Sequence, residues 1–140
     1  MKTGRTLYLL FGLYLAALLR ITVFRPGCFS HGLFSGRLVW EAFAYYAELA
    51  QRGSWRYFLY LFGGNLAWFA PAGIWAALRG RGFAAALLLG FGLSVLVESG
   101  QFLLGSGVSE LDDLILNTVG AGLGWLAAFF PLRRSRQKTT

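Results

Sequence analysis

The sequence predicts an all-α membrane protein, in which four transmembrane helices form a bundle and an amphipathic helix lies in the interface, within the first outer loop. Of its 140 residues, 56% are hydrophobic and 14% are charged, whereas soluble domains average about 25% charged residues. The apolar residues fall in four long runs, and a helix needs roughly 20 such residues to cross the bilayer. A chain of this length forms one compact domain, so residues 1–140 are expected to be a single integral membrane domain.

Charge and cysteine content exclude several other classes. The chain has 13 Lys and Arg against 6 Asp and Glu, a formal net charge of +7. No nucleic-acid partner is expected, because the basic residues lie between apolar runs instead of on a water-facing surface. The single cysteine, Cys28, cannot build a disulfide framework or a Cys-based metal cluster. We expect no metal and no cofactor, and we assign no role to Cys28 or His31.

The four predicted spans are long apolar runs, unlike the ~10-residue alternating segments of a membrane barrel. The first run could also begin a cleavable signal peptide, but it is long for that purpose and no small-x-small site follows it before Arg20. We therefore interpret it as a span. The predicted spans are residues 6–24, 57–78, 83–104 and 114–132.

The distribution of Lys and Arg predicts the orientation, because cytoplasmic loops carry the excess of basic residues. Both termini are therefore predicted to be cytoplasmic, and the basic tail, residues 133–140, is expected to rest against anionic headgroups. One side of the spans carries Lys2, Arg5, Arg79, Arg81, Arg133, Arg134, Arg136 and Lys138, and the other carries Arg25, Arg37, Arg52 and Arg56.

The outer segment between the first two spans predicts a further helix over residues 38–50. Trp40, Phe43 and Ala47 recur there at helical spacing, and the segment is rich in aromatic residues. This pattern favours a helix lying in the headgroup zone. A short helix folded back on the bundle fits the pattern equally well. Either arrangement would act as a lid or collar on the outer side.

Polar residues within the spans are the candidate site, because a charged side chain in hydrocarbon costs at least ~2.5 kcal/mol and therefore needs a partner, a wet cavity or a role. The depth of each of these residues is counted from the end of its span. By this count they lie in the outer half of the bilayer, except Asp113, which lies at the entry to the fourth span. The candidate ligand-binding residues are Arg20, Asn65, Glu98, Gln101, Asp113 and Asn117.

Helical spacing predicts how these side chains meet. Glu98 and Gln101 share one face of the third span, and Asp113 and Asn117 share one face of the fourth. If these spans pack as an antiparallel hairpin across residues 105–112, the four side chains converge at its mouth. Arg20 is then the one basic residue placed to neutralise them at depth, while Ser109, Glu110 and Asp112 are expected to face water or cap the fourth helix.

Packing roles are also expected within the spans. Gly120 and Gly124 form a GxxxG pattern that lets a neighbouring helix approach closely, and Pro71 predicts a kink. Asn65 and Gln101 could equally serve as interhelical hydrogen-bonding groups with no further function. A purely structural role is harder to accept for Glu98 and Asp113. Two carboxylates near one face of the bundle cost free energy unless they are paired, protonated or bound to something.

These motifs resemble the VanZ-like membrane proteins. The family pattern appears here as Asn65 followed by Phe69, Pro71 and Gly73, then Glu98 with Gln101, then Asp112, Asp113, Asn117, Gly120 and Gly124. The resemblance covers residues 63–124 well and the first span only by hydropathy. Residues 39–43 depart from the family's Asn-Leu-x-Pro-Phe segment, and residues 106–108 lack the Arg that many members carry before the acidic pair.

The resemblance implies a multi-pass protein of the bacterial plasma membrane, whose best-known relatives lower susceptibility to teicoplanin, a lipid-bearing glycopeptide. We predict an outward-facing polar pocket that binds an envelope headgroup or glycolipid. The expected partners are membrane lipids and a lipid-linked cell-wall precursor or a lipoglycopeptide. No nucleophile-base pair or His ligand set predicts an enzyme. A small intramembrane hydrolase using Glu98 and Asp113 as acid and base, and a proton or ion pathway, remain as alternatives.

Overall fold

The computed structural model of the chain describes residues 2–26, 28–29 and 32–137. Four of the helices within these residues are long and apolar enough to cross a membrane, so the predicted all-α membrane architecture is confirmed. In chain order the elements are α1 (Lys2–Thr22), β1 (Arg37–Val39), α2 (Ala44–Gln51), α3 (Trp55–Leu78), α4 (Phe83–Leu103), β2 (Val108–Glu110) and α5 (Leu111–Gln137).

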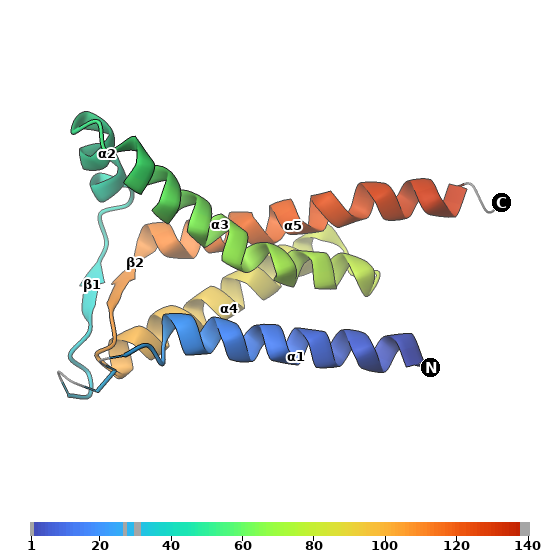
Figure 1. Cartoon of the computed structure of the whole chain (residues 1–140), viewed down its shortest axis with the longest axis horizontal. Coiled ribbons are helices and arrows are strands. Elements are labelled where there is room, and N and C mark those ends of the chain that lie inside the picture. The colour runs from blue at the N-terminus through green and yellow to red at the C-terminus, as the bar shows by residue number, and fades with distance from the viewer. Residues whose placement is uncertain (1, 27, 30–31, 138–140) are drawn as a thin grey trace.

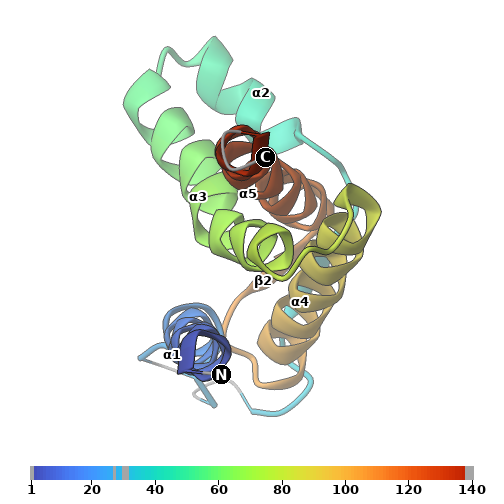
Figure 2. The same cartoon turned by 90° about the vertical axis from the view of Figure 1, so that its right-hand side faces the viewer.

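The two ends of the molecule differ in structure (Figure 1). Helix α1 begins and helix α5 ends at one end, which we call the terminal end. The short strands and α2 lie at the opposite end, which we call the ladder end. Figure 2 shows α3, α4 and α5 packed together, with α1 set apart from α5. Large apolar side chains such as Leu13, Tyr60 and Leu88 point outward, as expected for surfaces that face lipid.

Helices α3 and α5 pack closely because glycines remove side chains from their contact. A Cβ atom at Gly120 would collide with the backbone of Leu66, and one at Gly124 would collide with the backbone of Ala70. We call Gly73, Gly120 and Gly124 the glycine seam. The close approach predicted from the GxxxG pattern is therefore confirmed, whereas the kink at Pro71, which lies inside α3, stays a prediction.

The boundaries of α5 differ from the expectation at both ends. The helix begins at Leu111 instead of near residue 114, so Asp112 and Asp113 lie in its first turn. It continues to Gln137, so the basic tail is helical as far as it is described. Acidic residues favour the first turn of a helix because the backbone N–H groups there carry partial positive charge.

The outer segment contains a strand where the sequence predicted helix. Residues Arg37–Val39 form β1, which pairs in parallel with β2, Leu38 opposite Ser109. The preceding segment also donates backbone hydrogen bonds to the end of α4, from Phe34 N–H to the Leu103 carbonyl at 2.9 Å and from Gly36 N–H to the Phe102 carbonyl at 3.1 Å. These partners satisfy carbonyls that a helix end leaves open. Sequence periodicity could not reveal these hydrogen bonds, because their donors lie in a segment that is distant from α4 in the sequence.

Helix formation in the outer segment is restricted to α2, since Phe43 before it has a positive φ of 60°. The buried Tyr46 ring packs edge-on against Phe58 and Phe62 of α3, with centroids 5.4 and 5.7 Å away. The helix is thus folded back on the bundle, which is the second of the two predicted arrangements.

Candidate functional site

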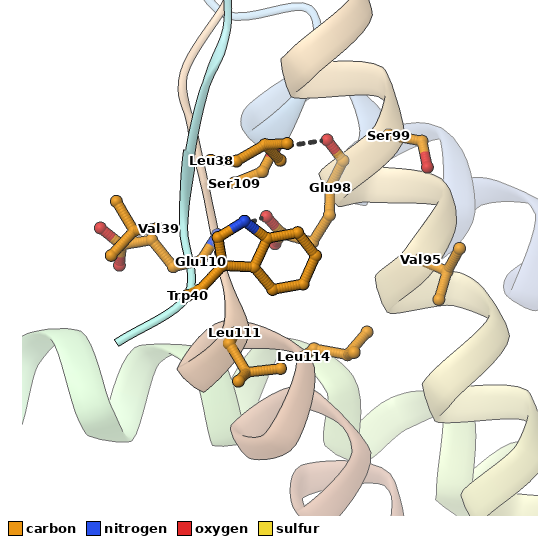
Figure 3. A pocket seen from close by; sticks show the side chains of 10 residues that line it. All are labelled: Leu38, Val39, Trp40, Val95, Glu98, Ser99, Ser109, Glu110, Leu111 and Leu114. Carbon is orange, nitrogen blue, oxygen red and sulfur yellow. Dashed lines mark hydrogen bonds between the residues drawn. The ribbon is translucent and has the colours of Figure 1, made fainter. Parts of the chain in front are cut away.

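A pocket of about 140 Å³ lies at the ladder end, between α4, the start of α5 and the paired strands. Most of its lining side chains are apolar, and the polar ones gather near Glu98 (Figure 3). Its walls are formed by Leu38, Val39, Trp40, Val95, Leu111 and Leu114, and its polar groups are Glu98, Ser99, Ser109 and Glu110.

Glu98 is held in this pocket by β2. Its Oε2 atom accepts a hydrogen bond from the Glu110 backbone N–H at 3.0 Å. Its backbone carbonyl accepts another from the Ser109 hydroxyl at 2.7 Å, and both bonds are drawn in Figure 3. The strand therefore fixes the Glu98 carboxylate beside the pocket, a role that the sequence did not suggest for Ser109 or Glu110.

Four acidic residues at the ladder end interact electrostatically, although no three described carboxylates are placed together as metal ligands would be. Glu98 interacts electrostatically with Asp113, Glu110 and Asp112, and Asp113 interacts with Glu110 and Asp112. We call these four residues the acidic cluster. Burial, with a further contribution from the charge of Asp112, raises the pKa of Glu110 above its ordinary value.

Asp112 is the least exposed member of the acidic cluster, at 2%. Its Oδ1 atom is buried without a hydrogen-bond partner. Ser109 is buried as well, at 6% exposure. Ser109 and Asp112 were expected either to face water or to cap the fourth helix, and their burial contradicts the first alternative. Asp112 lies in the first turn of α5, as the second alternative requires.

Arg20 does not neutralise the acidic cluster. Its side chain is exposed and donates a hydrogen bond to the Phe24 backbone carbonyl at 2.6 Å. That interaction satisfies a carbonyl just beyond the end of its own helix, which is a common use of a basic residue at a helix C-terminus. The countercharge role predicted for Arg20 is wrong. In the described part of the chain, the one ion pair joins Arg52 to Glu48.

Arg25, which the sequence analysis did not single out, reaches the connection between α4 and α5 instead. Its Nε donates to the Ser106 backbone carbonyl, and its guanidinium lies beside Gly107, next to the Gln101 side chain. A guanidinium from just beyond α1 thus lies beside the connection that precedes Asp112 and Asp113. No sequence signal marks this contact, because the two residues are 81 positions apart.

Asn65 and Asp113 are brought together across α3 and α5. The Asn65 amide donates a hydrogen bond to Asp113 Oδ1 and lies 3.5 Å from the Tyr46 hydroxyl. Burial, and next the charge of Asp113, raises the pKa of Tyr46 above its ordinary value, so this hydroxyl stays protonated. Tyr46 thereby joins α2 to the two residues, although its sequence position suggested only an interfacial aromatic.

Gln101 and Asn117 form hydrogen bonds away from Glu98 and Asp113. Gln101 donates to the Thr22 carbonyl of α1 at 3.2 Å, and Asn117 donates to the Ser94 hydroxyl of α4 at 2.9 Å. Both side chains are buried and serve as interhelical hydrogen-bonding groups. The predicted convergence of four polar side chains thus holds for Glu98 and Asp113 alone.

The register of the hairpin explains this difference. Antiparallel packing sets Ser94 opposite Asn117, so Glu98 lies one turn farther along, at the level of Asp113. Gln101 lies another turn farther, where α5 has not yet begun, and it faces α1 instead. Within the residues that the structure describes, no group of three His, Cys, Asp or Glu side chains is placed to hold a metal ion.

Comparison with known proteins places this geometry in a family context. A family model described as VanZ/LLP1 matches residues 7–132. No curated protein and no solved structure gives a significant match. The matched region contains the whole acidic cluster, the paired strands and the glycine seam, and it reaches well beyond the segment that carried the sequence resemblance.

Proposed function

The chain belongs to the VanZ/LLP1 family, and from this premise we propose that it binds an envelope amphiphile, a lipid-linked headgroup or a lipoglycopeptide, in the pocket beside Glu98. We assign it to the bacterial plasma membrane as a binding protein without catalytic activity. In this role it would lower susceptibility to teicoplanin-type glycopeptides, as VanZ-like relatives do.

The observation that carries the proposal is the chemistry of the pocket. Its apolar walls suit a hydrocarbon or ring system, and the Glu98 carboxylate offers a polar contact at one side. A small-molecule site usually combines an apolar lining with a few positioned polar groups. With a volume of about 140 Å³, the pocket suits a headgroup and the first part of a hydrocarbon tail. The rest of the tail would continue along the membrane.

The distribution of basic residues supports an outward-facing site. Among the described residues, seven Lys and Arg lie in the segments at the terminal end and four lie in the loops at the ladder end. The side with more basic residues is normally cytoplasmic. The pocket would then open at the face where lipid-linked wall precursors meet glycopeptide antibiotics.

The test is a susceptibility assay in a deletion strain. Glu98→Ala and Asp113→Ala should each abolish protection against teicoplanin while membrane abundance stays at the wild-type level. Glu41→Ala is the matched control, because Glu41 is an exposed acidic residue at the same end and does not line the pocket. Full protection by Glu98→Ala would refute the proposal, as would a loss that follows protein abundance.

A further inference from the structure

Helix α1 packs loosely on the rest of the bundle, and aromatic side chains make its contacts with α3. The Phe11 and Trp75 rings stack with their centroids 4.3 Å apart, and the Tyr14 hydroxyl donates a hydrogen bond to the Trp68 carbonyl at 2.8 Å. Of the described α1 span, 6% is buried within the protein, against 33% of the α5 span. Most of the α1 surface therefore contacts lipid, including the surface beside these aromatic contacts.

A groove of about 180 Å³ lies between α1 and α3 in the half of the molecule nearest the terminal end. Apolar and aromatic side chains line it, among them Leu7, Leu10 and Phe11 of α1 and Ile74, Trp75 and Leu78 of α3. Leu10, Ile74 and Leu78 are exposed, so the groove opens toward the surrounding lipid. A hydrocarbon chain suits such a lining.

Arg79 and Tyr8 join the two helices at the end of this groove. Arg79 directly follows α3 and lies one turn beyond Trp75. Its Nη2 donates a hydrogen bond to the Tyr8 hydroxyl at 3.1 Å, and its guanidinium carbon lies 4.9 Å from the centroid of the Tyr8 ring. A guanidinium has five N–H donors, so the other donors can reach a second acceptor. The Tyr8 hydroxyl, which accepts this bond, can still donate its own proton.

The charges at the terminal end favour a negatively charged acceptor. The 6 acidic residues of the chain lie in the outer segment, near the end of α4 and from β2 to the first turn of α5, so none lies beside Arg79. Arg5 precedes Tyr8 by three residues on α1, a spacing that places both on one helix face. Basic groups between spans at the cytoplasmic side are typical of sites for anionic lipid headgroups.

We propose that the groove between α1 and α3 binds one anionic phospholipid. Its phosphate contacts the Arg79 guanidinium and the Tyr8 hydroxyl, and one acyl chain lies against Leu10 and Ile74. Arginine suits this contact because its planar N–H groups match the oxygens of a phosphate. A second copy of the chain fits less well, since a symmetric contact at this face would bring like charges together. The site lies away from the pocket beside Glu98 and does not depend on the proposed function.

Native mass spectrometry of the purified full chain in a neutral detergent tests the headgroup preference. The probes are phosphatidylglycerol and phosphatidylcholine with identical acyl chains at equal concentration, which differ in net headgroup charge. Wild-type protein should retain phosphatidylglycerol about fivefold better, the ratio expected for one basic side chain near an anionic headgroup. Arg79→Gln should lose most of this preference, and Arg79→Lys, which keeps the charge, should keep most of it. Arg133→Gln is the matched control, because Arg133 is an exposed basic residue of α5 that does not line the groove.

Filling the groove tests where the acyl chain lies. Ile74→Trp places a larger ring on the wall of the groove and should reduce retention of phosphatidylglycerol severalfold. Leu13→Trp adds the same ring to an exposed position of α1 outside the groove and should leave retention unchanged. Both variants should unfold at the wild-type temperature, because both positions are exposed.

Three results would overturn the proposal. The first is equal retention of the two lipids by wild type. The second is an equal loss of preference in Arg79→Gln and Arg133→Gln, because the basic end as a whole would then attract lipid without a defined site. The third is unchanged retention by Ile74→Trp, which would place the lipid elsewhere. A wild-type dimer that stays free of lipid in the presence of phosphatidylglycerol would also overturn it, by identifying a second copy of the chain as the occupant.

Discussion

Helix α5 contains two regions that are built on opposite principles. Around the glycine seam, α3 and α5 approach so closely that added Cβ atoms would enter the opposing backbone. At its first turn, Asp112 and Asp113 join two more carboxylates, and a buried oxygen has no donor. The first region gains stability from packing, and the second gives some of it up. Such a local departure from good packing and polar satisfaction is typical of a functional site held by a rigid frame.

The largest expected effect comes from the glycine seam. Gly124→Ala should destabilise the fold by about 1–3 kcal/mol, because the new methyl group overlaps the Ala70 backbone and forces the helices apart. Thermal unfolding in detergent, followed by circular dichroism, measures this change.

Gly92→Ala is the control for this comparison. Gly92 lies within α4 with open space around its Cβ position. Alanine is the better helix former, so this variant should be neutral or up to about 1 kcal/mol more stable. Equal behaviour of the two variants would mean that the seam does not hold the frame.

An intermediate effect of opposite sign is expected at the acidic cluster. Asp112→Asn removes a buried charge whose Oδ1 has no donor and should raise the free energy of unfolding by about 1 kcal/mol. A decrease in stability would show that Asp112 acts mainly as a structural residue of α5.

The smallest expected effect is the pH dependence contributed by Glu110. Its pKa is raised from the ordinary 4.5 by burial and then by Asp112, so the folded state favours the protonated form. The associated stability is present below pH 4.5 and decreases as the pH rises through the folded-state pKa. Glu98, Asp113, Tyr45 and Tyr46 also interact electrostatically with this group.

The unfolding temperature of wild type relative to Glu110→Gln should therefore decline as the pH is raised from 4.5 toward 7. A flat difference between the two proteins across this range would show that Glu110 remains solvated in the folded state.

The residue types of the site could largely be predicted from the sequence, but their arrangement in space could not. Helical spacing correctly placed Glu98 and Asp113 near one another, because both lie on long helices joined by a short connection. Gln101 and Asn117 were expected beside them, yet each bonds to a different helix. The register between helices decides which polar side chains meet, and spacing along one helix does not contain that information.

Residues from distant segments could not be predicted at all. Trp40 borders the pocket because residues 37–39 pair with residues 108–110. Arg25 reaches Ser106 across 81 positions, while Arg20, the candidate suggested by depth, turns to its own helix end. In both cases the backbone path of the outer segment determines the contact.

The sequence by itself determined the four spans and the close packing at Gly120 and Gly124, because hydrocarbon thickness and the volume of a missing side chain act locally on each helix. It also determined that carboxylates enter the membrane region, since their cost there is large wherever they lie. Only the tertiary structure decided that β2 holds Glu98, that Asp112 is buried and that no arginine neutralises them within the described chain. Those outcomes depend on which segments form hydrogen bonds with one another's backbone N–H and C=O groups. These groups are nearly the same in every residue, so the sequence does not show which of them pair.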